Sequence, residues 1–253
     1  MRFAGIDIGS RSIEVLVLDE SAEVVNRLQS DTSFDPIEKV EQLLEGLDFQ
    51  AIVATGYGRS FFELQYDEPT ATEIKAHAKG ARALFPEAQT ILDIGGQDSK
   101  AISLFESGRV RKFEMNDRCA AGTGKFLEVM ARTLGYEIDD FGREALLAKK
   151  DLKISSMCTV FAESEVTSLI AKGESRREIA RGLHESVIRR AAGMIKRVSS
   201  RGDIVFTGGV ARNPCIAALL EEKMGRKVLI ADEPQFVGAL GAALLAAESL
   251  VNH

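Results

Sequence analysis

The apolar and polar positions of the chain follow the same pattern twice, 86 residues apart. The first copy contains Asp7-Ile8-Gly9-Ser10 and the second contains Asp93-Ile94-Gly95-Gly96, and at the same offset Leu16 matches Ile102. In both copies the segments after the Asp-x-Gly motif are apolar on both faces, as in strands buried within a sheet. We therefore predict two copies of one frame: a strand ending in Asp-x-Gly, a tight turn, a second strand, a polar turn and a third strand.

Apolar residues at helical spacing follow each copy of the frame. They predict helices over residues 36–47, 72–85, 123–134, 163–172, 176–198 and 236–247, with short strands over 50–54, 203–206 and 227–230. This order predicts an α/β fold of two lobes that face each other across a cleft. We expect residues 1–85 to form the first lobe and residues 86–253 the second, with the closing helix, 236–250, free to pack back on the first.

Facing lobes would bring the two Asp-x-Gly turns opposite one another, which suits a nucleoside triphosphate. The glycines let backbone N–H groups approach phosphate oxygens, because no Cβ intervenes. Asp7 and Asp93 can hold a hydrated Mg²⁺ between them, and Gln97 can orient an attacking water. A third turn, Thr207-Gly208-Gly209, follows a late strand and can cradle the adenosine. One such turn is common, so the repetition is what favours a nucleotide site.

Cys119 stands directly before a second glycine-rich segment, Gly122-Thr123-Gly124, which opens an amphipathic helix. The positive end of a helix favours anions and thiolates. The segment is not a P-loop, because Cys119 occupies the place of its first glycine and Phe126 that of its Ser/Thr. Cys158 also precedes a predicted helix. Two cysteines make half of a four-thiolate metal site, which a twofold dimer can complete. Spacing alone leaves open the alternative that they, like Cys215, are small buried residues.

Composition narrows the function further. The net charge of -6, with 32 basic against 38 acidic residues, argues against nucleic-acid binding. The apolar run at the start is too short for a signal peptide, and the longest one, 237–247, is too short to cross a bilayer. Three cysteines do not suggest a disulfide framework. We expect a cytoplasmic protein that binds neither nucleic acid nor membrane.

Six segments, in their order along nearly the whole chain, resemble the activators of 2-hydroxyacyl-CoA dehydratases, a family grouped with the ATPase subunits of benzoyl-CoA reductases. They are 55–59, 72–81, Asp93-Ile94-Gly95-Gly96-Gln97-Asp98-Ser99-Lys100, 116–124, Cys158-Thr159-Val160-Phe161-Ala162-Glu163-Ser164-Glu165 and 208–213. The segments around Cys119 and Cys158 are the specific part of this resemblance. The Asp-x-Gly motifs are shared with the wider superfamily of actin, sugar kinases and heat-shock ATPases.

This resemblance implies duplicated ribonuclease-H-like lobes, as in actin-like ATPases, around a nucleotide cleft that binds ATP or ADP with Mg²⁺. It implies a homodimer with one 4Fe–4S cluster shared by the two subunits, ligated by Cys119 and Cys158 of each. It also implies that ferredoxin or flavodoxin reduces the cluster, and that ATP hydrolysis drives one electron into a 2-hydroxyacyl-CoA dehydratase or a related reductase component.

We therefore predict catalytic roles for Asp7, Asp93 and Gln97. The predicted nucleotide-binding residues are Gly9, Ser10, Arg11, Ser12, Gly95, Gly96, Gln97, Gly122, Thr123, Gly124, Gly208, Gly209, Asn213 and Gln235. The chain departs from the family at Glu14, where a lysine is usual. Arg11 can supply the missing positive charge, and Lys100, the repeat counterpart of Glu14, retains its own. Glu73 and His77 also match the family pattern. Two roles stay open for Glu73, holding a water near the Mg²⁺ or forming a surface or interlobe salt bridge, and none is assigned to His77.

Two other functions fit the same frame. A small-molecule kinase would need a base aimed at a substrate hydroxyl and a substrate-shaped insertion, for which 253 residues leave little room. An actin-like scaffold would form filaments in response to nucleotide, and the compact acidic chain gives this no particular support.

Overall fold

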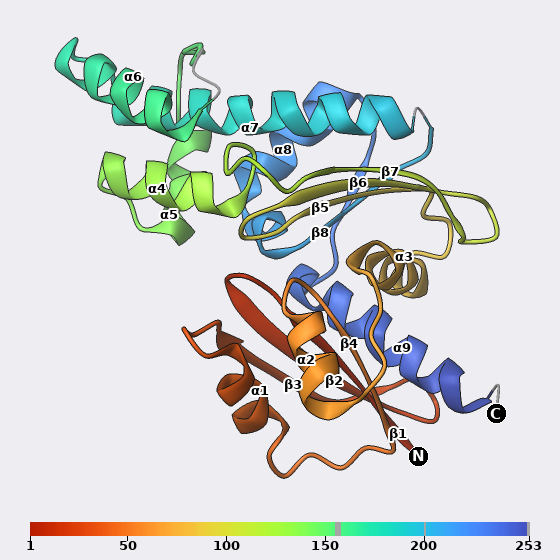
Figure 1. Ribbon diagram of the computed structural model, residues 1–253. Coiled ribbons are helices and arrows are strands. Elements are labelled where there is room, and N and C mark those ends of the chain that lie inside the picture. Colours follow the sequence, from red (N-terminus) through yellow and green to blue (C-terminus); the bar gives the residue numbers. More distant parts are fainter. Residues whose placement is uncertain (155–157, 200, 252–253) are drawn as a thin grey trace.

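The computed structural model describes residues 1–154, 158–199 and 201–251 and arranges them in two lobes (Figure 1). The first lobe contains β1 (Arg2–Ile8), β2 (Ser12–Asp19) and β3 (Val24–Asp31), and the second contains β5 (Thr90–Ile94), β6 (Ser99–Leu104) and β7 (Val110–Asn116). Both antiparallel ladders break register at the same repeat position, between Val17 and Leu18 and between Ser103 and Leu104. The predicted duplicated frame is confirmed, and the two copies also share this break in register.

Parallel strands extend each antiparallel meander into a mixed sheet. Strand β4 (Ala51–Thr55) joins β1, which makes the order β3-β2-β1-β4 in the first lobe. Strands β8 (Ile204–Thr207) and β9 (Val228–Leu229) extend the second sheet to β7-β6-β5-β8-β9. Strands β2 and β6 are buried almost along their whole length, as their apolar pattern predicts. The Asp-x-Gly motifs therefore lie at the carboxyl ends of β1 and β5, in the interior of each sheet.

Helices cover both faces of both sheets. In the first lobe, α1 (Pro36–Leu44) and α2 (Arg59–Tyr66) share one hydrophobic cluster with β1 and β2, and α9 (Val237–Val251) packs on the opposite face. In the second, α3 (Glu73–Leu84) covers one face. The other face carries the largest described core, built with α4 (Gly124–Leu134), α5 (Ile138–Leu146), α6 (Thr159–Ala171), α7 (Arg176–Val198) and α8 (Pro214–Met224).

Helices α3 and α9 lie side by side between the two sheets (Figure 1). Helix α3 comes from the first half of the chain, yet Ala78 and Ala81 pack against Ile91 and Ile102 of the second sheet. Helix α9 closes the chain, yet its alanines pack against the first sheet. Each helix thus covers the sheet formed by the other half of the chain.

Several helix boundaries differ from those that the apolar pattern predicts. Helix α6 begins four residues earlier, directly after Cys158. Helix α1 ends at Leu44, because Gly46 adopts a left-handed conformation with φ 75°. Helices α2 and α5 are absent from the sequence-based prediction; each is short, and each is held by an aromatic residue buried to within 1% of full coverage, Phe62 or Phe141. Among the described helices, none has the length and apolar character that crossing a membrane requires.

Candidate nucleotide site

A cavity of about 1100 Å³ lies between the lobes, and the two Asp-x-Gly turns meet in it. The turns have the same backbone hydrogen bond: Gly9 N donates to Ser12 O and Gly95 N donates to Asp98 O, both at 3.0 Å. They also touch, because a Cβ on Gly96 would lie only 2.7 Å from the Cβ of Arg11. The cavity is large enough for a nucleotide, and its phosphate end would face these turns.

A second pair of glycines shapes the floor of the cavity. Gly56 follows β4 with φ 91° and Gly208 follows β8 with φ 84°, a backbone conformation that favours glycine. A Cβ on Gly56 would lie 2.5 Å from Asp7 Oδ1, and one on Gly208 would lie 2.7 Å from Asp93 Oδ1. The duplication therefore includes the turn after each parallel strand. The fixed offset does not reveal this match, because α4 to α7 enter the second lobe between its strands.

Most of the residues predicted to bind nucleotide line this cavity. The lining contains all three predicted catalytic residues and, of the predicted nucleotide-binding residues, Gly9, Ser10, Arg11, Ser12, Gly95, Gly96, Gln97, Gly124, Gly208, Gly209, Asn213 and Gln235. Gly122 and Thr123 lie outside the lining. Thr123 is fully buried, and its hydroxyl donates to Ala120 O at 2.6 Å.

The start of α4 is bonded to the second Asp-x-Gly turn. Gly124 N donates to Gly95 O at 2.9 Å, and Lys125 N donates to Gly96 O at 2.8 Å. Two of the free N–H groups at this helix start are therefore engaged by protein carbonyls. These two bonds connect α4, and with it the segment that contains Cys119, to the second Asp-x-Gly turn.

Lys100 neutralises the carboxylates of the second lobe. Its Nζ, which is almost fully buried, lies 2.5 Å from Glu73 Oε2, 2.6 Å from Asp98 Oδ2 and 3.1 Å from Asp93 Oδ2. Burial disfavours the charged ammonium group, but the three carboxylates outweigh it and raise the pKa of Lys100. Burial also disfavours the charged form of Asp93 and raises its pKa, but His77 and Lys100, with a hydrogen bond from Thr207, outweigh this and hold the pKa below its usual value. Asp93 is therefore ionised.

Asp7 is the first-lobe equivalent of Asp93, and in the described chain it has no lysine partner. Asp7 pairs in register with Glu14, and burial, reinforced by the charge of Glu14, raises the pKa of Asp7 well above its usual value. Burial also raises the pKa of Glu14 to about 7, although Ser12 Oγ at 2.5 Å and Gln29 Nε2 at 3.0 Å donate to its Oε1. The Arg11 side chain pairs with Glu128 and Asp31 instead.

The guanidinium of Arg11 joins the lobes across the mouth of the cavity. Its Nε lies 2.8 Å from Glu128 Oε1 on α4, and its Nη1 lies 3.3 Å from Asp31 Oδ1. Arg11 therefore lines the cavity and also serves as a contact between the lobes, and its role as the positive charge of the first turn stays a prediction.

His77, on α3, lies between the two strand-end aspartates. Its Nδ1 is 3.5 Å from Asp93 Oδ1 and 3.2 Å from Thr207 Oγ1, and its Nε2 is 3.9 Å from Asp7 Oδ2. The role left open by the sequence is thus a bridging position between the lobes. Glu73, on the same helix, is held by Lys100 and lies 4.0 Å from Arg59 Nη1.

The other end of the cavity is lined by α5, which the sequence pattern does not predict. It contributes Ile138, Asp139, Gly142 and Arg143 opposite Asn213. The Asn213 side chain begins α8: its Oδ1 accepts from Cys215 N at 3.0 Å and from Ile216 N at 3.1 Å.

Two buried groups complete this end of the cavity. Asn213 Nδ2 lies 2.9 Å from His184 Nε2, and burial lowers the pKa of His184 to about 4, so the ring is neutral and accepts this hydrogen bond. Gln235 Oε1 is buried and has no hydrogen-bond partner within the described chain, which makes it available to a bound ligand.

The cysteines lie outside the cavity lining. Cys119 is half-buried, in a loop held by Asn116, whose Nδ2 donates to Cys119 O at 2.9 Å and to Ala121 O at 3.2 Å. Cys158 is exposed at the start of α6, next to Val160 and Phe161, which are 66% and 68% exposed. Cys215 is buried, and this burial raises the pKa of its thiol to about 12. Within residues 1–154, 158–199 and 201–251, no three His, Cys, Asp or Glu side chains are grouped to hold a metal.

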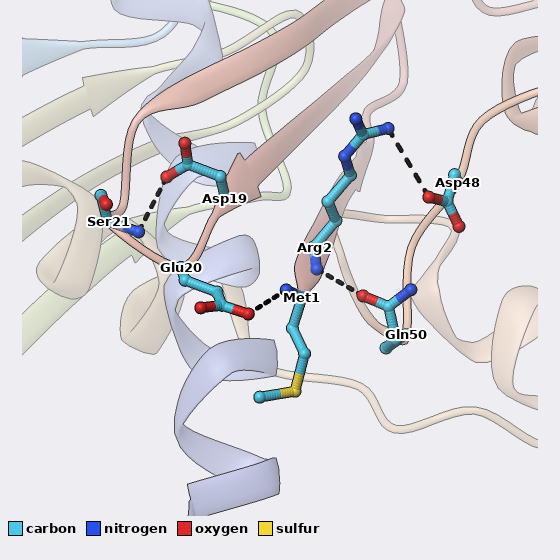
Figure 2. Close-up of a pocket in the computed structure, with 7 residues that line it drawn as sticks. All are labelled: Met1, Arg2, Asp19, Glu20, Ser21, Asp48 and Gln50. Carbon is cyan, nitrogen blue, oxygen red and sulfur yellow. Dashed lines mark hydrogen bonds and ion pairs between the residues drawn. The ribbon is translucent and has the colours of Figure 1, made fainter.

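A second cavity, of about 460 Å³, lies at the opposite end of the first sheet (Figure 2). Polar groups at the start of β1, the end of β2 and the segment before β4 line it. They include an ion pair between Arg2 Nη1 and Asp48 Oδ2 at 3.6 Å and a hydrogen bond from Ser21 N to Asp19 Oδ1 at 2.8 Å. None of the predicted site residues lines it. The predicted catalytic residues and most of the predicted nucleotide-binding residues therefore gather at the interlobe cavity, and the cysteines lie outside its lining.

The fold and this cavity define a class: two ribonuclease-H-like lobes with duplicated turns around a cleft, the architecture of actin-like ATPases and sugar kinases. A ROK family glucokinase from Streptomyces griseus, at 13% identity and a TM-score of 0.63, shares this fold. The model of the BadF/BadG/BcrA/BcrD ATPase family matches residues 4–246, and the chain belongs to that family.

More similar proteins share nearly the full length. The activator of lactoyl-CoA dehydratase from Anaerotignum propionicum is 44% identical over 97% of both chains. The crystal structure of (R)-2-hydroxyglutaryl-CoA dehydratase component A from Acidaminococcus fermentans is 39% identical, with a TM-score of 0.92 over 99% of both chains. The activator of the 2-hydroxyisocaproyl-CoA dehydratase from Clostridium difficile, with bound ADPNP, is 37% identical, with a TM-score of 0.91 over 100% of this chain and 96% of that one.

Proposed function

We propose that this protein is an ATP-hydrolysing activator that passes one electron to a 2-hydroxyacyl-CoA dehydratase or a related reductase component. The observation that carries the proposal is the direct bonding of α4 to the Asp-x-Gly turn at the phosphate end of the cavity. A change at that turn on ATP binding or hydrolysis would move α4 and the segment that contains Cys119. Relatives at 37% to 44% identity that are named dehydratase activators support the choice of partner.

In the nucleotide part of the proposal, ATP binds between the lobes with its phosphates at the two Asp-x-Gly turns. Asp7 and Asp93 hold a hydrated Mg²⁺, and Gln97 orients the attacking water. Their common position in the cavity lining supports this, as does the ADPNP bound to a similar protein. The adenosine lies towards Gly209, Asn213 and α5.

For the electron-transfer part, Cys119 and Cys158 of two subunits would hold one 4Fe–4S cluster, which accepts an electron from ferredoxin or flavodoxin and passes it on when bound. The residues fit such a group. Cys158 is exposed at the start of α6 and Cys119 is half-buried in the loop before α4, while the third cysteine is buried. One chain offers two of four ligands, so a homodimer would complete the set. The exposed Val160 and Phe161 supply apolar surface beside Cys158 for that contact.

The small-molecule kinase is the less favoured alternative. Its support is the shared fold with a glucokinase at 13% identity, which does not extend to function. ATP turnover that depends strictly on an added sugar or carboxylate would favour it over the activator.

The first test is anaerobic iron–sulfur reconstitution followed by iron and sulfide analysis. We expect about four iron and four sulfide per two chains. Replacing Cys119 or Cys158 with serine is expected to remove the cluster and leave ATP binding intact. The matched control is Cys215→Ser, which changes a buried thiol and should keep the cluster. A protein that stays colourless after reconstitution, or that loses its cluster only in Cys215→Ser, would disprove the electron-transfer part.

A further inference from the structure

Arg11 belongs to the first Asp-x-Gly turn, and its side chain begins where the two turns meet. A Cβ on Gly96 of the second turn would lie 2.7 Å from the Cβ of Arg11. Thr32 N donates to Arg11 O at 3.0 Å, which holds the backbone of Arg11 at the end of β3. The side chain lines the cavity, so its direction depends on the acidic groups within its reach.

Two carboxylates hold the guanidinium group of Arg11. Its Nε lies 2.8 Å from Glu128 Oε1 on α4, and its Nη1 lies 3.3 Å from Asp31 Oδ1 at the end of β3. The contact with Glu128 is the one that crosses from the first lobe to the second. The Arg11 side chain is 56% exposed, and such an exposed ion pair contributes little stability, so another anion can replace the carboxylate.

Glu128 has a second cation beside it. Its Oε2 lies 3.5 Å from Nζ of Lys125, which is one turn earlier on α4. Glu128 also lines the cavity. The contact between Arg11 and Glu128 can therefore open without leaving the Glu128 carboxylate unpaired, because Lys125 stays next to it.

We infer that Arg11 and Glu128 form an exchangeable ion pair through which the nucleotide site discriminates between ATP and ADP. Without nucleotide, Glu128 holds the guanidinium group, and the γ-phosphate of ATP competes with Glu128 for it. An arginine donates to phosphate oxygens with the same forked geometry that it uses for a carboxylate. ADP has no γ-phosphate and leaves the pair with Glu128 closed.

The exchange rests on the proposed function and adds to it a signal from the nucleotide to α4. Helix α4 is connected to the second turn by the backbone N–H groups of Gly124 and Lys125, and to the first turn by the pair between Arg11 and Glu128. Transfer of Arg11 to the phosphate removes the connection to the first turn. The second lobe therefore loses one contact with the first lobe when ATP is bound, and keeps it when ADP is bound.

The test is a calorimetric titration of the full-length protein, after anaerobic reconstitution, with ADPNP and with ADP in the presence of Mg²⁺. Glu128→Gln removes the competing carboxylate and should raise the affinity for ADPNP about threefold. Arg11→Gln removes the group that binds the γ-phosphate and should lower this affinity at least about tenfold. In both variants the affinity for ADP should stay within about twofold, since only an exposed ion pair is lost.

The control is Lys125→Gln, which also removes a cation from Glu128 but lies outside the cavity lining. Its ratio of ADPNP affinity to ADP affinity should stay within about twofold of that of the unsubstituted protein. Arg11→Lys keeps the charge and should recover part of the affinity lost in Arg11→Gln. Far-ultraviolet circular dichroism checks the folding of each variant, and Arg11→Lys serves if Arg11→Gln does not fold.

A contact that only held the lobes together would give a different result. Glu128→Gln and Arg11→Gln would then shift the affinity for ADPNP in the same direction, and the reversed pair, Arg11→Glu with Glu128→Arg, would restore it. Either outcome, or equal shifts for ADPNP and ADP, would overturn the inference and leave the proposed function standing. A protein that binds neither nucleotide would instead contradict the nucleotide part of the proposed function, and the exchange with it.

Discussion

The two lobes share one backbone frame, yet their strand-end aspartates lie in opposite electrostatic surroundings. Asp93 is held by Lys100, Thr207 and His77, and its pKa lies below the usual value. Asp7 faces Glu14 across the same antiparallel pairing, and its pKa lies well above it. Strand pairing depends on backbone hydrogen bonds and apolar burial, so the residue opposite each aspartate can change charge without altering the frame.

The largest change in stability is expected when Lys100, which pairs with three carboxylates in the second lobe, is replaced. Lys100→Met leaves the buried Asp93 and the half-buried Asp98 and Glu73 without their common partner, and should lower the free energy of unfolding by about 3–5 kcal/mol in urea titrations. Lys79→Met is the control, because Lys79 pairs with Glu248 at the surface, and its loss should cost no more than about 1 kcal/mol. Equal effects of the two substitutions would contradict the assigned role of Lys100.

In the first lobe, which has an acidic residue where the second has Lys100, we expect the free energy of unfolding to depend on pH. Burial raises the pKa of Glu14 from 4.5 in the unfolded chain to about 7, so protonation favours the folded state. This contribution is complete below pH 4.5 and is lost as the pH rises through 7, in total on the order of 3 kcal/mol.

The measurement is the free energy of unfolding against pH, in EDTA, for the unsubstituted protein and Glu14→Gln. The variant should lack this fall and become the more stable of the two above pH 7. Parallel profiles would show that Glu14 is not the group responsible.

The smallest expected effect is the difference in unfolding free energy between valine substitutions at Thr207 and at Thr55. Thr207→Val removes a hydroxyl that donates to Asp93, and should cost about 2 kcal/mol in EDTA. Thr55→Val removes a buried hydroxyl without a partner, so we expect a change within about 0.5 kcal/mol. A cost at Thr55 as large as that at Thr207 would mean that the Thr55 hydroxyl has a hydrogen-bond partner in the folded protein.

Much of the fold follows from local patterns. The strands of both meanders, the Asp-x-Gly turns and the long helix Arg176–Val198 are where the apolar pattern places them. Helix α5 was missed because Gly142 interrupts a short segment that has little helical signal of its own, and burial of Phe141 and Ala145 in the second-lobe core holds it. The adenosine end of the predicted site was therefore incomplete.

The contacts in the site between residues distant in the chain could not be predicted from local patterns. The match of Gly56 with Gly208 has no fixed offset, since four helices enter the second lobe between its strands. The glycine-rich start of α4 looks like an anion site in sequence, but two of its N–H groups donate to Gly95 O and Gly96 O. Such competition between protein and ligand acceptors is decided by contacts distant in the chain.

The duplicated frame, the two strand-end aspartates and the positions of the cysteines before helices follow from periodicity and neighbouring residues, and so from local sequence. Packing of distant segments sets the rest: α3 and α9 exchange sheets, Lys100 gathers three carboxylates, and Arg11 pairs with Glu128 while Glu14 faces Asp7. The charge on a buried side chain is balanced by whichever groups packing brings within a few ångströms, and local sequence does not specify those groups.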